Sequence, residues 1–256
     1  MAIIAALLDR PSATIALRRT TPRLLATVRS CRTAARFRRL IEADLVDAAV
    51  VGVRAAQILD LTAFAQRFPS LPVLIYGAIR SDQATVIREF YERGAVAVLV
   101  EGVDDPVVGE LVVRNGYLAR RRAELSELPR RLRLTEPLQR QALDRLLGRV
   151  GVPASTMALA RGMGVSREHL SRQFAAGGAP NLKRVIDLLQ VLTARDLLGN
   201  PGHSATSVVR LLGFADESHL RAVVKRVVRL SFREYRRMTT PELLRRFVAR
   251  SARSRG

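Results

Sequence analysis

The chain has 256 residues, 48% of them hydrophobic and 26% charged, which excludes a disordered protein and is long enough for two domains. Its net charge of +20 is uneven: residues 1–127 hold 18 Lys and Arg against 14 Asp and Glu, whereas residues 128–256 hold 25 against 9, so we expect a polyanion to bind the second half. No apolar run is long enough to span a membrane, and the single Cys31 allows neither an internal disulfide nor a metal-ligand set. We therefore expect a cytoplasmic protein without membrane contact and without a bound metal or cofactor.

The first 125 residues alternate short β-rich runs with segments of helical period. The strand candidates are rich in Val, Ile and Ala, and the helix candidates repeat apolar residues every three or four positions. Such β-α units with short connections predict a parallel sheet covered by helices on both faces. The expected strands are 2–9, 24–30, 47–53, 72–78 and 95–100, and the expected helices are 12–19, 32–44, 58–69, 81–94 and 107–124.

The pattern changes at residues 126–137, where SELPRRLRLTEP contains two prolines and has no strand period. We expect a linker there, between an N-terminal α/β domain, residues 1–125, and an all-α domain, residues 138–237. Residues 238–256 are expected to add a C-terminal helix and a basic tail, RSARSRG. The predicted fold class is thus an α/β domain followed by an all-α domain.

Two segments of the all-α part share one layout: a short helix, a tight turn that contains glycine, and a second helix. In residues 155–174, Gly164 falls in the turn and Ser166 is placed to cap the second helix. In residues 204–226, Gly213 and Asp216 have the same roles. Two such helix-turn-helix units in tandem are a much stronger signal than one helical hairpin.

The second helix of a helix-turn-helix unit is the one that enters the major groove, led by its N-terminal turns. Arg can bind guanine through two hydrogen bonds, and Glu can accept one from the cytosine amino group. The candidate DNA-binding residues are Arg167, Glu168, Ser171 and Arg172 in the first unit and Glu217, Ser218, Arg221 and Lys225 in the second.

The segments SREHLSRQF, TARDLL, GFADESHL and SFREYR, in this order and spacing, resemble the AraC-type DNA-binding domain over roughly residues 138–237. The resemblance implies seven helices, with a linker helix, Leu182–Leu198, that joins the two helix-turn-helix units. It further implies a transcription regulator whose two recognition helices read successive major grooves of double-stranded DNA.

The second unit departs from the AraC-type pattern at several positions. Leu220 replaces the usual Phe, and Ala222 replaces an Arg. Arg229 and Phe232 replace the Gly and Pro of the closing G-x-x-P motif. We therefore expect the second unit to contribute phosphate contacts more than base readout.

Residues 1–125 resemble a response-regulator receiver domain with a flavodoxin-like (βα)5 fold, best matched in FPSLPVLIYGA and ERGAVAVLV. A receiver needs a phospho-accepting Asp after its third strand, a hydroxyl after the fourth and a Lys after the fifth. Here these positions hold Gly52, Gly77 and Glu101, and Asp9 is the one acid left near the first strand. We therefore expect a degenerate receiver that regulates or dimerises the chain without a phosphorylation site.

Two other functions fit parts of the sequence. An architectural protein that binds DNA without sequence preference fits the basic tail and the loss of Arg at position 222. An enzyme that the C-terminal domain targets to DNA fits the α/β domain, but no expected strand end presents a nucleophile with a base, so no catalytic residue is assigned. Besides DNA, the partners considered are RNA polymerase and a second copy of the chain, paired through the N-terminal domain.

Overall fold

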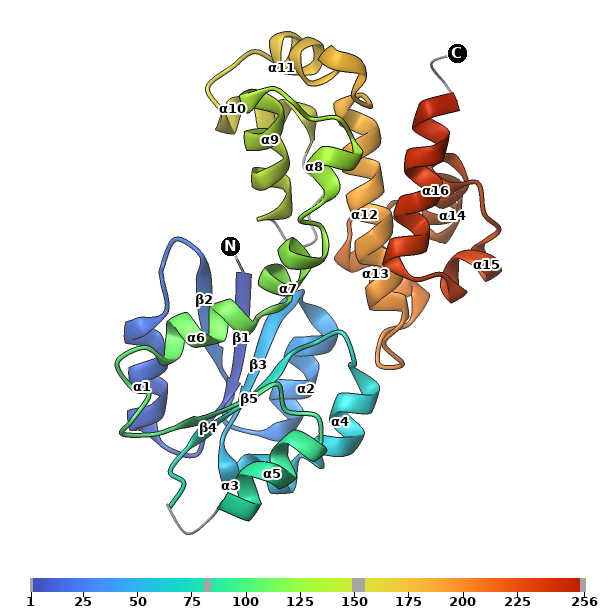
Figure 1. Cartoon of the computed structure of the whole chain (residues 1–256). Coiled ribbons are helices and arrows are strands. Elements are labelled where there is room, and N and C mark those ends of the chain that lie inside the picture. The colour runs from blue at the N-terminus through green and yellow to red at the C-terminus, as the bar shows by residue number, and fades with distance from the viewer. Residues whose placement is uncertain (1, 81–83, 149–154, 254–256) are drawn as a thin grey trace. The chain divides into compact units, whose positions relative to one another are not determined.

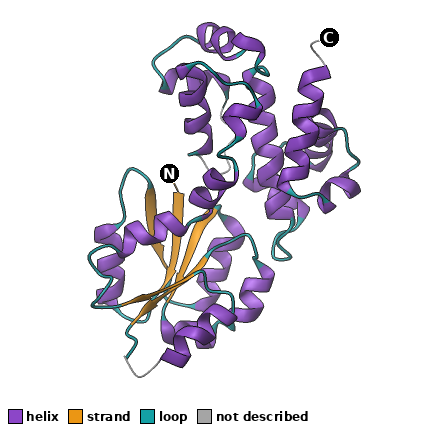
Figure 2. Ribbon diagram, viewed as in Figure 1, coloured by secondary structure: helices purple, strands orange, loops and turns teal. Residues whose placement is uncertain are grey.

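The computed structural model describes residues 2–80, 84–148 and 155–253. The chain divides into two compact units. The N-terminal unit comprises Met1–Arg121 together with Asn200–His203, and the C-terminal unit comprises Arg122–Gly199 and Ser204–Gly256. All strands of the described residues belong to the N-terminal unit, and the C-terminal unit is helical (Figure 2).

A five-stranded, all-parallel sheet forms the centre of the N-terminal unit, with strand order β2-β1-β3-β4-β5 (Figure 1). This is the flavodoxin-like order, so the predicted fold class is confirmed for this unit. The strands are β1 (Ala2–Leu7), β2 (Ala26–Ser30), β3 (Val46–Val51), β4 (Val73–Gly77) and β5 (Ala97–Val100). The helices are α1 (Pro11–Thr20), α2 (Ala34–Ala43), α3 (Val53–Ile58), α4 (Leu61–Arg67), α5 (Ala84–Glu92), α6 (Val108–Asn115) and α7 (Tyr117–Glu124), of which α7 continues into the C-terminal unit.

The sheet buries both of its faces, because successive side chains of a strand point to opposite sides. Ala5 and Leu7 of β1 belong to one core with α2, α3, α4 and α5, whereas Ile4 and Ala6 belong to the other core with α1 and α6. Figure 1 shows the same two layers of helices on either side of the sheet. Because all the strands are parallel, their carboxyl ends lie along one edge of the sheet. Gly52, Gly77 and Glu101, which follow β3, β4 and β5, lie at this edge.

One expected helix starts later than predicted, and another is broken into two. The expected helix 58–69 corresponds to α4, which begins after Asp60; the φ of Asp60 is 51°, and its carboxylate accepts a hydrogen bond from the Ala63 N–H. The helix before it, α3, was not expected. The segment 107–124 is interrupted at Gly116, where the buried Asp47 accepts the Leu118 N–H at 2.7 Å. A Cβ at position 116 would lie 2.1 Å from Asp47 Oδ2, so this break requires glycine. Of the expected helix 81–94, residues 81–83 lie outside the described part.

The C-terminal unit is built from helices around a long central helix. Its helices are α8 (Leu128–Arg131), α9 (Pro137–Leu147), α10 (Thr156–Gly162), α11 (Arg167–Phe174), α12 (Leu182–Leu198), α13 (Ala205–Leu211), α14 (Glu217–Val228), α15 (Phe232–Arg237) and α16 (Thr240–Arg253), with a short 3-10 turn at Ala176–Gly178. Helices α9 to α15 correspond to the seven that were expected, and α12 has the predicted bounds of the linker helix. Ten of its residues are buried, including Val185, Leu188, Val191 and Leu192, so α12 is the spine of this unit.

The segments on either side of these seven helices are more ordered than expected. Residues 126–137, expected to be a linker, contain α8 and bury Leu128, Leu132 and Leu134. At the other end, α16 extends through Arg253, into the segment that was expected to be a tail. Leu243 and Phe247 of α16 are fully buried, and α16 packs against α12 and α14. Residues 254–256 lie outside the described part.

Candidate nucleic-acid interface

The first helix-turn-helix unit consists of α10 and α11. Ser155 caps α10 by accepting the Ala158 N–H at 3.0 Å, and Ser166 caps α11 by accepting the His169 N–H at 3.1 Å. Gly164 makes the turn between them with a φ of 70°, in the left-handed region that favours glycine. The predicted cap and turn residues of this unit are therefore confirmed.

The predicted residues of this unit lie on the solvent side of α11, opposite the buried Leu170 and Phe174. Arg167 and Glu168 pair with each other, with Arg167 Nε 3.1 Å from Glu168 Oε1. The backbone N–H of Glu168 and the Arg167 guanidinium lower the pKa of Glu168, which keeps its carboxylate charged as a hydrogen-bond acceptor. Among the described residues, the side chains of Ser171 and Arg172 have no hydrogen-bond or ion-pair partner, so they are free to bind a ligand.

The second helix-turn-helix unit consists of α13 and α14. Ser204 caps α13, and Asp216 caps α14 by accepting the His219 N–H at 2.7 Å. Gly213 makes the turn with a φ of 66°. Leu220 is fully buried on the inner side of α14, where the AraC-type pattern has Phe, so this replacement keeps the residue in the core.

The predicted residues of α14 fall into two groups. Ser218 and Lys225 are exposed, and their side chains have no partner among the described residues. Glu217 is held from two sides, because it accepts the Thr206 hydroxyl of α13 at 3.1 Å and lies 3.7 Å from the Arg221 guanidinium. Glu217 is therefore held in place within its own unit.

A buried glutamine of α9 supports α11. Gln139 has no exposed surface, and its Nε2 donates to the carbonyl oxygens of Gln173, Phe174 and Ala176 at 3.2, 3.0 and 3.1 Å. Its Oε1 accepts the Glu136 N–H at 3.0 Å. These carbonyl groups belong to the C-terminal end of α11 and the turn after it, so one amide fixes the end of the first recognition helix against α9.

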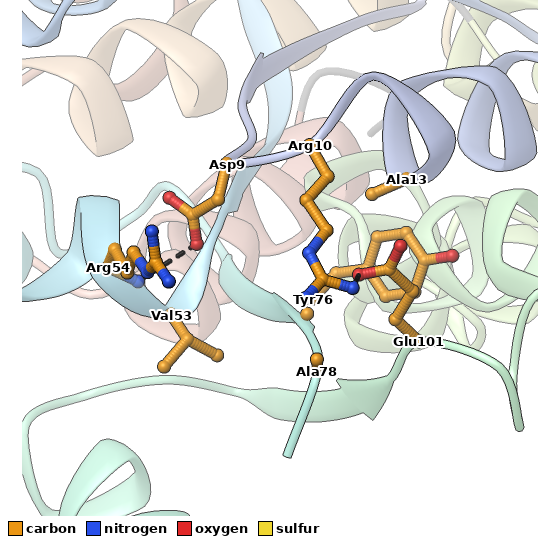
Figure 3. A pocket seen from close by; sticks show the side chains of 9 residues that line it. Asp9, Arg10, Ala13, Val53, Arg54, Tyr76, Ala78 and Glu101 are labelled. Atoms are coloured by element: carbon orange, nitrogen blue, oxygen red, sulfur yellow. Dashed lines mark hydrogen bonds and ion pairs between the residues drawn. The ribbon is translucent and has the colours of Figure 1, made fainter.

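In the N-terminal unit, a cavity of about 250 Å³ lies at the carboxyl edge of the sheet, lined by Asp9, Arg10, Ala13, Val53, Arg54, Tyr76, Gly77, Ala78 and Glu101 (Figure 3). Asp9 is turned toward the start of α3, where it accepts the N–H groups of Arg54 and Ala55 at 2.9 and 3.0 Å. Gly52 begins α3 without a side chain of its own, so the carboxylate of Asp9 caps the helix for it.

Two other charged residues of the cavity, Arg10 and Glu101, pair with each other. Glu101 accepts the Ser12 hydroxyl at 2.7 Å and lies 3.7 Å from the Arg10 guanidinium. A Cβ at position 52 would lie 2.6 Å from Asp9 Cγ, because the carboxylate of Asp9 fills the space that a side chain there would need. No group of three or more potential metal ligands occurs among the described residues. In this cavity Asp9 caps α3 and Glu101 pairs with Arg10. The position that follows β3 is Gly52, so no carboxylate lies there.

Residues 159–238 match the family model described as a helix-turn-helix domain. The chain carries a helix-turn-helix domain. The match begins in α10 and ends just after α15, so it includes both units and excludes α16. The domain predicted from the AraC-type segments is therefore confirmed as a helix-turn-helix domain.

The similar solved structures share little sequence with the chain. Full-length FixJ from B. japonicum is 16% identical, with a TM-score of 0.40, and the match covers 90% of this chain and 98% of that one. A phosphorylated response regulator from Burkholderia pseudomallei is 16% identical, with a TM-score of 0.38 and coverages of 67% and 98%. RcsB from Salmonella enterica serovar Typhimurium, bound to promoter rprA, is 11% identical, with a TM-score of 0.35 and coverages of 73% and 98%. No curated protein matches the sequence.

Two residues that position side chains or helices of the candidate interface were not predicted from the sequence. Gln139 lies in the buried stripe of α9 with Ala142, Leu143 and Leu146. A polar residue at a position of apolar period was the one sequence feature that could have indicated a buried hydrogen-bonding role. Phe232 was expected only as a replacement for the proline of the closing motif, but its ring centre lies 4.8 Å from the Arg221 guanidinium carbon.

The helices of the described residues include none with the length and apolar character needed to cross a membrane.

Proposed function

We propose that this protein is a sequence-specific DNA-binding transcription regulator, with α11 and α14 reading successive major grooves. The observation that carries the proposal is the pair of capped helix-turn-helix units inside one matched domain. The exposed faces of their second helices present Arg, Ser, Glu and Lys side chains, which suit base edges and phosphates. The excess of basic residues after residue 127 supports a polyanionic ligand.

Selection of bound sequences from random double-stranded DNA tests this proposal. We expect a motif in two parts, about one helical turn apart, because each recognition helix occupies one major groove. An architectural protein bends or coats DNA through its backbone and selects no such motif. Recovery of sequences with no shared bases would therefore support the architectural function. Salt dependence alone does not separate the two, since phosphate contacts dominate the affinity of both.

Arg172→Ala is expected to weaken binding to a selected site by about 1–3 kcal/mol and to relax the preference at one base position. The reason is that the unpaired guanidinium of Arg172 on α11 is available for two hydrogen bonds to a guanine. Equilibrium titrations with the selected site and with a scrambled site measure both effects.

Arg161→Ala is the matched control, because it removes one positive charge from the exposed surface of α10, outside the recognition helix. It is expected to weaken binding to selected and scrambled DNA about equally. If Arg172→Ala behaves in the same way, Arg172 contacts phosphate and the assignment as a base-reading residue is wrong.

The N-terminal unit is proposed to act without phosphorylation, as a pseudo-receiver. Phosphoryl transfer needs a free carboxylate nucleophile, and Asp9 is engaged by two backbone N–H groups while position 52 is Gly. Glu101 adds negative charge where a phosphoryl group would need a cation. We expect no mass increase when the full chain is incubated with acetyl phosphate and Mg²⁺, with a phosphorylatable response regulator treated alongside. A gain of one phosphoryl group on an Asp of residues 1–125 would overturn this part of the proposal.

A role of the N-terminal unit in pairing two copies of the chain is proposed on the same basis. A dimer raises the affinity of the C-terminal units for DNA through effective concentration, without new contacts to DNA. The half-exposed Tyr91 on α5 supports pairing through the α5 and α6 side of the unit. Sedimentation of the full chain and of Tyr91→Asp tests this: a chain that stays monomeric at high concentration removes the dimer. A transcription regulator acts where RNA polymerase acts, so contact with RNA polymerase and a cytoplasmic location are part of the proposal.

A further inference from the structure

We propose that Phe232 and Glu217 hold the Arg221 guanidinium in one orientation and that Arg221, so positioned, reads a base in the second helix-turn-helix unit. This inference rests on the proposed function of the chain as a sequence-specific DNA-binding regulator. It assigns Phe232 and Glu217 as positioning residues, and it replaces the expectation that the second unit binds mainly phosphates.

Arg221 is contacted on two sides by side chains of its own unit. Its Cζ lies 4.8 Å from the centre of the Phe232 ring, and its Nη2 lies 3.7 Å from Glu217 Oε2, one helical turn earlier. Its side chain nevertheless keeps 57% of its surface exposed. A guanidinium that stacks on an aromatic face keeps the N–H groups at its edge available, and these are the groups that bind a guanine.

The two positioning residues are themselves fixed. Glu217 accepts the Thr206 hydroxyl of α13, which ties it to the first helix of the unit. The Phe232 ring lies 5.7 Å from the ring of Tyr235, which is fully buried and donates its hydroxyl to the Val191 carbonyl of α12 at 2.6 Å. A continuous set of contacts therefore runs from the central helix through Tyr235 and Phe232 to the Arg221 guanidinium.

The sequence of α14 shows why this arrangement matters. Between Glu217 and Val224, Arg221 is the one Arg or Lys, because position 222 holds Ala. If the N-terminal half of α14 binds guanine through a guanidinium, Arg221 must supply it. An arginine loses many rotamers when it binds, so a side chain that is already held before binding loses less conformational entropy. Phe232 thus orients the one guanidinium that this part of α14 presents.

The test is a double-mutant cycle on the full chain, with DNA of the selected sequence and with a set of single-base variants of it. Phe232→Leu removes the aromatic face but keeps an apolar side chain, and we expect it to weaken binding by about two- to fivefold. Arg221→Ala should weaken binding by about fivefold or more and relax preference at the same base position. In the Arg221→Ala background, Phe232→Leu should have no further effect, because the ring acts only through Arg221. Glu217→Gln, which keeps the Thr206 hydrogen bond and removes the charge, should relax the preference at that same position.

Phe232→Tyr is the rescue variant, since it keeps the ring, and we expect it to retain the base preference. Thermal unfolding of each variant identifies any that fail to fold. If Phe232→Leu or Arg221→Ala fails to fold, the cycle is measured with Phe232→Tyr and Arg221→Lys in their place. If the losses from Phe232→Leu and Arg221→Ala multiply in the double variant, Phe232 has a general structural role and the inference is wrong. If the wild-type chain selects no motif at all, the proposed function fails first; if it selects one that Phe232→Leu leaves unchanged, only this inference fails.

Discussion

Phe247→Ala is expected to lower the free energy of unfolding of the C-terminal unit by about 3–5 kcal/mol. Phe247 lies on α16, beyond the end of the matched helix-turn-helix domain at residue 238, yet its ring is fully buried. It also lies under the Arg184 guanidinium of α12, 5.5 Å from the ring centre. Truncation to Ala removes these contacts and leaves a cavity beside α12 and α14, which other side chains fill only in part.

Urea denaturation of the full chain, followed by the helical circular dichroism signal, measures this loss. Since the chain has two units, two transitions are expected, and only the one of the C-terminal unit should shift. Arg246→Ala, the exposed neighbour on α16, is the control and should change the free energy of unfolding by less than about 0.5 kcal/mol. Equal stabilities of the two variants would show that α16 does not belong to the core of this unit.

Gln139→Leu is expected to destabilise the C-terminal unit by at least about 1–3 kcal/mol and to weaken DNA binding as well. The substitution removes the Nε2 donor from the carbonyl groups of Gln173, Phe174 and Ala176, and two of these contacts lie in partly buried surroundings and one is fully buried. A leucine has similar bulk, so the loss comes from unsatisfied carbonyl groups and not from a cavity. Because those groups end α11, the orientation of the first recognition helix becomes less fixed.

The chain offers a matched control in a glutamine that contacts its second helix-turn-helix unit. Gln190 of α12 donates from the same kind of amide to a single carbonyl, that of Leu212, at 3.1 Å. Gln190→Leu should therefore cost less, and its effect on base preference should fall on the bases read by α14. Gln139→Leu should affect the bases read by α11 instead. Chemical denaturation and sequence selection with both variants decide this, and equal costs with no separation of the affected bases would contradict the assigned role of Gln139.

Local signals made most of the fold predictable from the sequence. Short apolar runs rich in Val, Ile and Ala located all five strands, because both faces of the sheet are buried, and a helical period located the helices between them except α3. Ser166, Asp216, Gly164 and Gly213 identified the helix-turn-helix units, since caps and left-handed turns depend on one residue and its immediate neighbours. The bounds of the central helix α12 were implied by the AraC-type resemblance, and the structure agrees with them to the residue.

The features that were not predicted depend on contacts between residues far apart in the chain. Asp47 breaks the segment 107–124 from a distance of 71 residues, and Gln139 contacts α11 across 34 to 37 residues. Nothing local at Phe232 indicates that its ring meets Arg221, since that contact depends on the packing of α15 beside α14. The candidate site was therefore predicted as a set of exposed positions, but not as a set of oriented side chains.

The space shared by Asp9 and position 52 has an evolutionary consequence. A mutation that placed an aspartate at position 52 would put its Cβ 2.6 Å from Asp9 Cγ and would disrupt the cap of α3. Replacing Asp9 first would leave α3 without a capping side chain, because Gly52 has none. A substitution at either position therefore changes the cap of α3, and we expect the effects of substitutions at positions 9 and 52 to be epistatic. Evolution of one of these positions is then constrained by the residue at the other.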